Sequence, residues 1–245
     1  MNNYKLTLCY DGTRYRGFQK QGNTDNTIQG KLEALLSKLL EQPVEVHGCG
    51  RTDAGVHARE QICSFRAETT LSDEALLSSI RHYLPEDIGA DALSKADPRF
   101  HARLSCKEKT YLYRIWVSSA PCVFERKYVT KWEGALNRAA MMQAAHDLCG
   151  EHDFTAFTSN KHMKKSAVRN LKEIRFEEIE NELRLYFTGD GFLYNMVRIL
   201  VGTLLEVGMG KRTPNSMTAL LESKDREKAG FTAPPHGLTL YSIKY

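Results

Sequence analysis

Gly48-Cys49-Gly50-Arg51-Thr52-Asp53-Ala54-Gly55-Val56-His57-Ala58 separates two segments with strand patterns, residues 44–47 and 61–65. Its three glycines allow the backbone to adopt positive φ angles or to approach a ligand closely. Arg51 and Asp53 add one fixed cation and one carboxylate two positions apart. Since the alternating pattern resumes directly after this run, the run is predicted to be a loop between two strands.

A glycine-rich loop after a strand is also typical of phosphate-binding sites. The dinucleotide-binding fingerprint requires glycine at the position of Asp53 and a helix directly afterwards, and the Walker motif requires Gly-Lys-Ser/Thr. Neither pattern is present, and a carboxylate in the middle of the loop would repel phosphate. On local sequence alone, two interpretations of Asp53 remain: a turn residue paired with Arg51, or a reactive carboxylate.

The first part of the chain shows the element order β-α-β-β-α-β. Tyr4 to Tyr10 alternates as a strand, and apolar residues from Ile28 to Leu39 recur at helical spacing. Ser72 is a candidate N-cap for a second helix, which Pro85 ends. This order is that of the split βαβ or ferredoxin-like unit. The expected strands are 4–10, 44–47, 61–65 and 88–93, and the expected helices are 28–39 and 72–84.

The second part of the chain is expected to repeat that order, with a polar segment before its central strands. We predict an α+β fold of two ferredoxin-like (β-α-β-β-α-β) halves, with antiparallel sheets, helices on one face and an active-site cleft between the halves. The N-terminal half is residues 1–104 and carries the Asp53 loop; the C-terminal half is residues 105–245. Its expected strands are 110–117, 171–179, 183–188 and 238–245, and its expected helices are 136–148, 192–207 and a shorter one opened by Thr213-Pro214.

The composition is that of an ordinary globular protein, with 42% apolar and 26% charged residues. A formal net charge of +4 is too small to indicate nucleic-acid binding without a local cluster of cations. Six scattered cysteines form no C-x-x-C pair, so neither a metal site nor a disulfide framework is expected. The apolar run 192–207 is too short for a membrane span, and no signal peptide is seen, so a soluble, cytoplasmic protein is expected.

Two stretches combine features that suit RNA. The loop 13–26 carries cations between Tyr15 and Phe18, which could hold phosphates and stack bases; alternatively, it is a solvated loop with two anchoring rings. The polar segment 151–170 contains a second basic cluster, Lys161-His162-Met163-Lys164-Lys165.

Arg198 and Tyr111 stand out from their surroundings. Arg198 lies in an apolar helical pattern, so it is either solvent-exposed or paired with a carboxylate, because an unpaired buried guanidinium is costly. The scarcity of other polar residues in that pattern favours pairing with Asp53. Tyr111 lies in an alternating strand pattern, where a tyrosine is ordinarily part of the core.

Four motifs in the same order resemble those of the tRNA pseudouridine synthase A family. The first is Gly50-Arg51-Thr52-Asp53-Ala54-Gly55-Val56-His57, and the others lie at 100–113, 189–198 and 233–240. The resemblance implies that Asp53 is the catalytic nucleophile and that Arg198 contacts it. It further implies that Tyr111 stacks on the target uracil and that Leu238 or Leu240 lies under the base.

The resemblance implies an enzyme that isomerises uridine to pseudouridine at positions 38, 39 and 40 of the tRNA anticodon arm. Such an isomerisation requires no metal and no small-molecule cofactor, but it requires base flipping. The family acts as a homodimer with tRNA as its partner. Two positions depart from the family pattern: Lys109, where arginine is usual, and Phe18, where tryptophan is usual. The expected RNA-contact residues are Arg51, Arg14, Arg16, Lys20, Arg103, Lys109, Lys161, Lys164 and Lys165.

The sequence also bears on two alternatives to this enzyme. A non-catalytic RNA-binding module could use the same fold, with Asp53 and Arg198 as a structural pair, but the aromatic motif of the RNA-recognition module is missing. A nucleotide hydrolase would need a phosphate-binding lysine and carboxylates for magnesium, which the loop lacks.

Overall fold

The computed structural model describes all residues, 1–245, and divides them into two compact units. Unit 1 comprises Met1–Lys107 together with Thr239–Tyr245, and unit 2 comprises Glu108–Leu238. The sequence-based division put the boundary after residue 104 and gave the last strand to the second half. In the structure, residues Thr239–Tyr245 of that strand are grouped with the Asp53-bearing unit, where they pair with residues 57 and 58.

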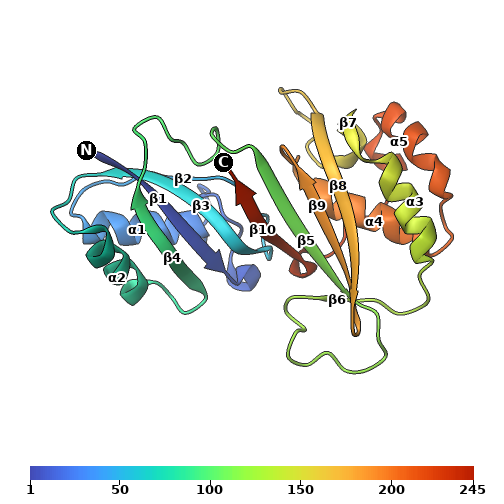
Figure 1. Cartoon of the computed structure of the whole chain (residues 1–245), viewed down its shortest axis with the longest axis horizontal. Helices are drawn as coiled ribbons and strands as arrows, with labels where there is room; N and C mark the ends of the chain where they lie inside the picture. The colour runs from blue at the N-terminus through green and yellow to red at the C-terminus, as the bar shows by residue number, and fades with distance from the viewer. The chain divides into compact units, whose positions relative to one another are not determined.

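Unit 1 contains the β-α-β-β-α-β order expected from the sequence (Figure 1). Its neighbouring strands follow the order β4–β1–β3, and β2 pairs with the other edge of β3, which is the arrangement of a ferredoxin-like sheet. These pairs are antiparallel. The bounds are β1 Asn2–Tyr10, α1 Ile28–Leu39, β2 Val46–Gly48, β3 His57–Ala67, α2 Asp73–Tyr83 and β4 Ile88–Lys95.

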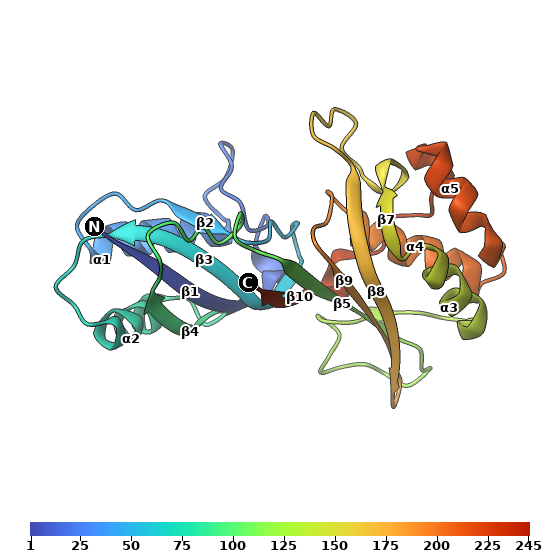
Figure 2. The ribbon, with the colours of Figure 1, turned by 45° about the horizontal axis from the view of Figure 1, so that its top comes forward.

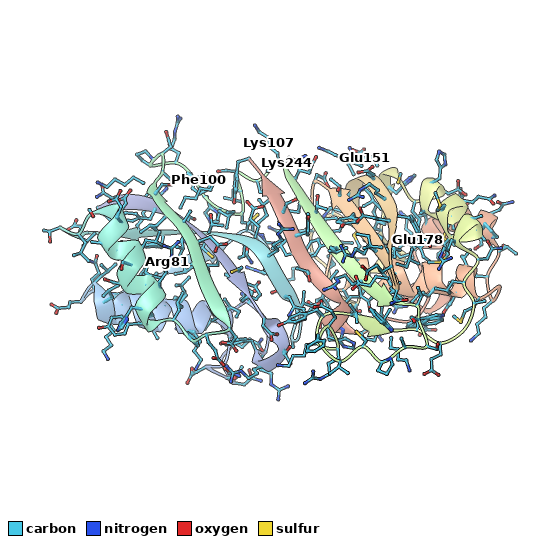
Figure 3. The ribbon with its side chains drawn as sticks, turned by 60° about the horizontal axis from the view of Figure 1, so that its bottom comes forward. Arg81, Phe100, Lys107, Glu151, Glu178 and Lys244 are labelled. Atoms are coloured by element: carbon cyan, nitrogen blue, oxygen red, sulfur yellow. The ribbon has the colours of Figure 1, made fainter.

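The last strand, β10 (Leu238–Lys244), completes unit 1. It pairs parallel to β3, with Thr239 opposite His57 and Leu240 opposite Ala58. This parallel pair departs from the expected antiparallel arrangement. Figure 3 shows Lys107 and Lys244 side by side, where the Lys107 N–H donates to the Lys244 carbonyl (N···O 2.9 Å).

Local sequence explains the elements of unit 1. Alternate residues of β1 (Tyr4, Leu6, Leu8 and Tyr10) are buried, as the period of a strand with one core face requires. Helix α1 begins where the Thr27 hydroxyl accepts from the Gly30 N–H (3.1 Å). Helix α2 is capped in the same way by Ser72, and acidic residues in its first turn suit the positive end of the helix dipole.

Unit 2 has the strand order β5–β9–β8–β7, with antiparallel neighbours, and its helices lie together (Figure 2). Residues Tyr111, Tyr113 and Ile115 of β5 are buried on one face, as their alternation predicted. The bounds are β5 Glu108–Trp116, β6 Thr130–Lys131, α3 Arg138–Asp147, β7 Gly150–Asp153, β8 Val168–Ile179, β9 Glu182–Gly189, α4 Met196–Gly208 and α5 Met217–Ser223.

Unit 2 differs from the sequence-based expectation in several places. The short strands β6 and β7 were not predicted, and β6 pairs parallel to β5. The helix expected from residue 192 begins only at Met196, because Asn195 takes a left-handed conformation (φ 61°, ψ 5°) that cannot continue a helix. The helix expected from Thr213 is a 3₁₀ turn, Pro214–Ser216, followed by α5. No helix in the structure combines the length and the apolar character needed to cross a bilayer.

Candidate active site

The turn that carries Asp53 has a fixed backbone. The Val56 N–H donates to the Asp53 carbonyl (3.1 Å), and Gly55 between them has φ +77°. A type II turn needs a positive φ at this third position, which explains the glycine. The Asp53 side chain is partly exposed at the start of the turn. Because β2 ends at Gly48 and β3 begins at His57, the prediction of a loop between two strands is confirmed.

Buried side chains hold the residues that precede Asp53. The Gln61 amide donates to the Gly50 carbonyl (2.6 Å) and accepts from the Gly50 N–H (3.0 Å). The Thr52 and Tyr10 hydroxyls share a hydrogen bond of 2.8 Å, and Gln61 is completely buried. Burial raises the pKa of Tyr10, so its hydroxyl stays protonated. This network fixes the chain on the N-terminal side of the candidate nucleophile.

The loop after β1 supports the turn from its other side. The Phe18 N–H donates to the Thr52 carbonyl (3.0 Å), and Gly17 has φ +96°. A Cβ at Gly12 would overlap the Val56 carbonyl, so the two loops touch through their backbones. Tyr15 and Phe18 are 5% and 2% exposed, so both rings pack into unit 1 and anchor the loop. Of the two interpretations of this loop, their burial favours the one with two anchoring rings.

The cations of unit 1 fall into two groups. Arg51 and Arg103 are both exposed, and burial, followed by the charge of Arg103, lowers the pKa of Arg51. Two like charges that affect each other in this way would be stabilised by a bound anion. Arg14, by contrast, donates to the Asp87 carboxylate (2.8 Å), and Lys20 lies 3.4 Å from Glu33. Arg16 belongs to the first group, because it is exposed and has no ion pair with a carboxylate in unit 1.

In unit 2, two neutral acceptors help to orient Arg198. Its Nε–H donates to the Ala233 carbonyl (2.6 Å), and an Nη1–H donates to Asn195 Oδ1 (2.9 Å). The Ala233 N–H returns a hydrogen bond to the Arg198 carbonyl (3.0 Å), which ties the segment before β10 to α4. Burial, followed by the charge of Arg198, lowers the pKa of His236. The guanidinium thus has a defined orientation, which recognition of a carboxylate requires.

Tyr111 lies in β5 opposite Phe187 of β9 and is 8% exposed. Its ring meets the Phe192 ring edge to face, with centroids 5.0 Å apart. The loop that carries Phe192 is fixed to β8, because Asn170 and Asp190 exchange hydrogen bonds of 3.0 and 3.2 Å. Motifs 100–113 and 189–198, far apart in sequence, therefore meet within unit 2 through these two rings.

The remaining predicted site residues occupy different environments. Leu238 is 5% exposed in unit 2, and Leu240 is completely buried in unit 1. Lys109 lies in β5 opposite Gly189 and is partly exposed. The three lysines of the second basic cluster, Lys161, Lys164 and Lys165, are all exposed.

Sequence reasoning missed several residues that shape these loops. Gln61 was read only as a strand residue, and His57, whose Nδ1 accepts from the Gly12 N–H (3.0 Å), was read only as part of a motif. Asn195 was assigned to the interior of a helix. The one signal that favours asparagine there is its tolerance of left-handed backbone angles, which becomes informative only once the turn is known.

Comparison with known proteins identifies the class to which this arrangement belongs. The family model for tRNA pseudouridine synthase matches residues 8–105 and 144–245, which include three of the four motifs noted in the sequence and residues 100–105 of the motif at 100–113. The chain belongs to this family of RNA-modifying isomerases, as those motifs predicted.

The relatives are similar along the whole chain. The protein is 44% identical over 245 residues to tRNA pseudouridine synthase A of Bacillus sp. (strain KSM-64). It is 42% identical to tRNA pseudouridine synthase A 2 of Bacillus anthracis and 43% identical to tRNA pseudouridine synthase A of Clostridium acetobutylicum. Each of these alignments covers 100% of both chains.

Proposed function

We propose that the protein isomerises uridine to pseudouridine at positions 38, 39 and 40 of the tRNA anticodon arm. The observation that carries this proposal is full-length similarity to enzymes named tRNA pseudouridine synthase A. The Asp53 turn supports it, because hydrogen bonds hold its backbone on both sides. Catalysis benefits when reacting groups are held in place before the substrate arrives.

Asp53 acts as the nucleophile in this proposal. Arg198 contacts its carboxylate, which favours the ionised form and sets its direction of attack. The N1–C1′ bond of the uridine breaks, the base turns, and a C5–C1′ bond forms; C5 then loses its proton and N1 gains one, so the product is an isomer of the substrate. No metal and no small-molecule cofactor enters these steps.

The target base must leave the stacked stem before Asp53 can reach it. Flipping costs a few kcal/mol of stacking and pairing. Tyr111 offsets part of this cost by stacking on the flipped uracil, and Leu238 supports the base from below. We favour Leu238 over Leu240 for this role, because Leu240 is completely buried. Arg51 holds the flipped nucleotide or fills the space that it leaves.

The RNA footprint in this proposal consists of exposed cations that contact phosphates. Arg16, Arg103 and the lysines of segment 161–165 contribute most, and Lys109 contributes at the edge of β5. Arg14 and Lys20 contribute less, since each lies beside a carboxylate. The proposed enzyme is a cytoplasmic homodimer that binds tRNA across both subunits, and light scattering on the purified protein tests the dimer.

Tritium release from tRNA labelled at C5 of uridine tests the activity. The wild-type protein is expected to release tritium from transcripts with uridine at positions 38, 39 or 40. Asp53→Asn is expected to bind tRNA with unchanged affinity and to release no tritium, because the amide keeps the shape but lacks the nucleophilic charge. Asp25→Asn, at an exposed loop carboxylate, is the control and should remain active. Pseudouridine formation by Asp53→Asn would refute the assignment of the nucleophile.

A further inference from the structure

Asn195 joins three segments of unit 2 through one side chain. It precedes α4 in a left-handed conformation (φ 61°, ψ 5°). Its Oδ1 accepts from an Nη1–H of Arg198 (2.9 Å), and its Nδ2 donates to Ser159 Oγ (3.0 Å). The polar atoms at both ends of the amide are therefore engaged, and their partners lie in α4 and in the segment after residue 157.

The chemistry of the partners fixes which way this amide points. A guanidinium has only donors, so it must meet the amide oxygen, which leaves the amide nitrogen for Ser159 Oγ. A flipped amide would place two donors against each other. The hydrogen bond to Ser159 thus prevents the side chain from turning away from Arg198. Together with the Ala233 carbonyl, Asn195 holds the guanidinium at two of its edges.

The same turn also anchors the basic segment. The Tyr194 carbonyl accepts from the Ser159 N–H and from Thr158 Oγ1, each at 3.2 Å. Asn160 follows directly and leads into the exposed lysines of segment 161–165. Hydrogen bonds at residues 194 and 195 therefore connect the base of the cationic loop to the arginine of α4.

We propose that Asn195 is a positioning residue, which holds the Arg198 guanidinium in the orientation that the reaction needs. This inference rests on the proposed role of Arg198. Asn195 acts through Arg198 and does not touch the reacting atoms. Asparagine suits the position twice, because it accepts the left-handed backbone and presents one acceptor and one donor on opposite sides.

The experiment separates the side chain from the backbone conformation. Asn195→Gly removes the amide and keeps a residue that adopts φ 61° without strain. Glu180→Gly, at another non-glycine residue with positive φ (51°) and an exposed side chain, is the matched control. Single-turnover tritium release is measured at saturating enzyme, the affinity for tRNA is measured by filter binding, and thermal unfolding is followed by circular dichroism.

The expected result is a loss of rate without a loss of binding. Asn195→Gly should lower the single-turnover rate about tenfold to hundredfold, since a displacement of about 1 Å at a catalytic group costs that much. Its affinity for tRNA and its melting temperature should match those of Glu180→Gly. A rate equal to that of Glu180→Gly would overturn the inference.

Asn195→Asp is a second variant. If the role of Asn195 were purely structural, this variant should keep the wild-type rate. Aspartate accepts left-handed angles and keeps an acceptor for Arg198, so folding should be unchanged. It loses the donor to Ser159 and adds a negative charge beside the guanidinium, so its rate should fall at least as far as that of Asn195→Gly. A wild-type rate for this variant would contradict the inference. If the wild-type protein itself releases no tritium, the proposed function fails and not merely this role of Asn195.

Discussion

The amide of Gln61 should be one of the most sensitive positions in unit 1. It is completely buried and satisfies both backbone polar groups of Gly50, three residues before Asp53. Gln61→Leu keeps a similar volume, so no water replaces the amide, and it leaves a buried N–H and a buried C=O without their partner. Each such group costs about 1–3 kcal/mol, so the free energy of unfolding should fall by about 2–6 kcal/mol.

A second glutamine provides the control for this prediction. Gln42 makes the same double hydrogen bond, donating to the Glu68 carbonyl (2.6 Å) and accepting from the Glu68 N–H (3.1 Å). That pair lies at the surface, where water can replace the amide. Gln42→Leu should therefore cost less than about 1 kcal/mol, the net value of one ordinary hydrogen bond.

Urea unfolding and thermal melting measure the difference. Each kcal/mol corresponds to about 2–4 °C in melting temperature for a chain of this size. Gln61→Leu should also slow tritium release, because the loop before Asp53 loses its anchor, whereas Gln42→Leu should not. Equal unfolding free energies for the two variants would refute the view that Gln61 fixes this loop.

Two further predictions concern charge. Replacing the three lysines of segment 161–165 with glutamine should reduce the magnitude of the slope of log affinity for tRNA against log salt by about 2–3. Arg14→Gln should leave this slope nearly unchanged. Filter binding between low and moderate salt measures both slopes. The Glu182 carboxylate accepts hydrogen bonds from Arg114 and Arg184. Burial raises the pKa of this carboxyl, but the two guanidiniums lower it more strongly, so the pKa lies below its usual value. The ion pairs therefore stabilise the fold above that usual value and are lost as the pH falls through the lowered one. In urea unfolding, Glu182→Gln should cost about 1.5–3 kcal/mol at pH 7, and this cost should shrink as the pH falls through the lowered pKa.

Local patterns in the sequence predicted most elements of unit 1. The bounds of α1, the cap at Ser72 and the alternation of β1 depend on neighbouring residues, and the structure confirms them. The pairing of β10 with β3 could not be predicted in this way. It joins residues that are far apart in the chain, and an alternating pattern does not indicate which strand it will meet.

The start of α4 illustrates a second limit. Phe192 and Leu193 extend the apolar pattern of the helix, so periodicity placed its beginning too early. The helix begins later because Asn195 has a positive φ, a choice that depends on its contacts with Ser159 and Arg198. A short polar side chain was visible in the sequence, but its partners were not.

The candidate site was predictable to the extent that it rests on motifs. The family that the four motifs suggested is confirmed, and the loop position of Asp53 follows from the strands on either side. The roles of Asp53, Tyr111 and Arg198 stay predictions that the variants above test. Buried supporting residues such as Gln61 escaped sequence reasoning, because a buried amide in a strand has no distinctive pattern.

The pairing of β10 with β3 makes unit 2 an insertion within unit 1. During translation, the whole of Glu108–Leu238 would emerge from the ribosome before the strand that pairs with His57 and Ala58. Synthesis proceeds at about 5–20 residues per second, so the incomplete edge of β3 would stay open for several seconds. A truncated product would therefore keep the Asp53 motif but lack the strand beside it, so the capacity to act on tRNA would depend on translation reaching the final strand.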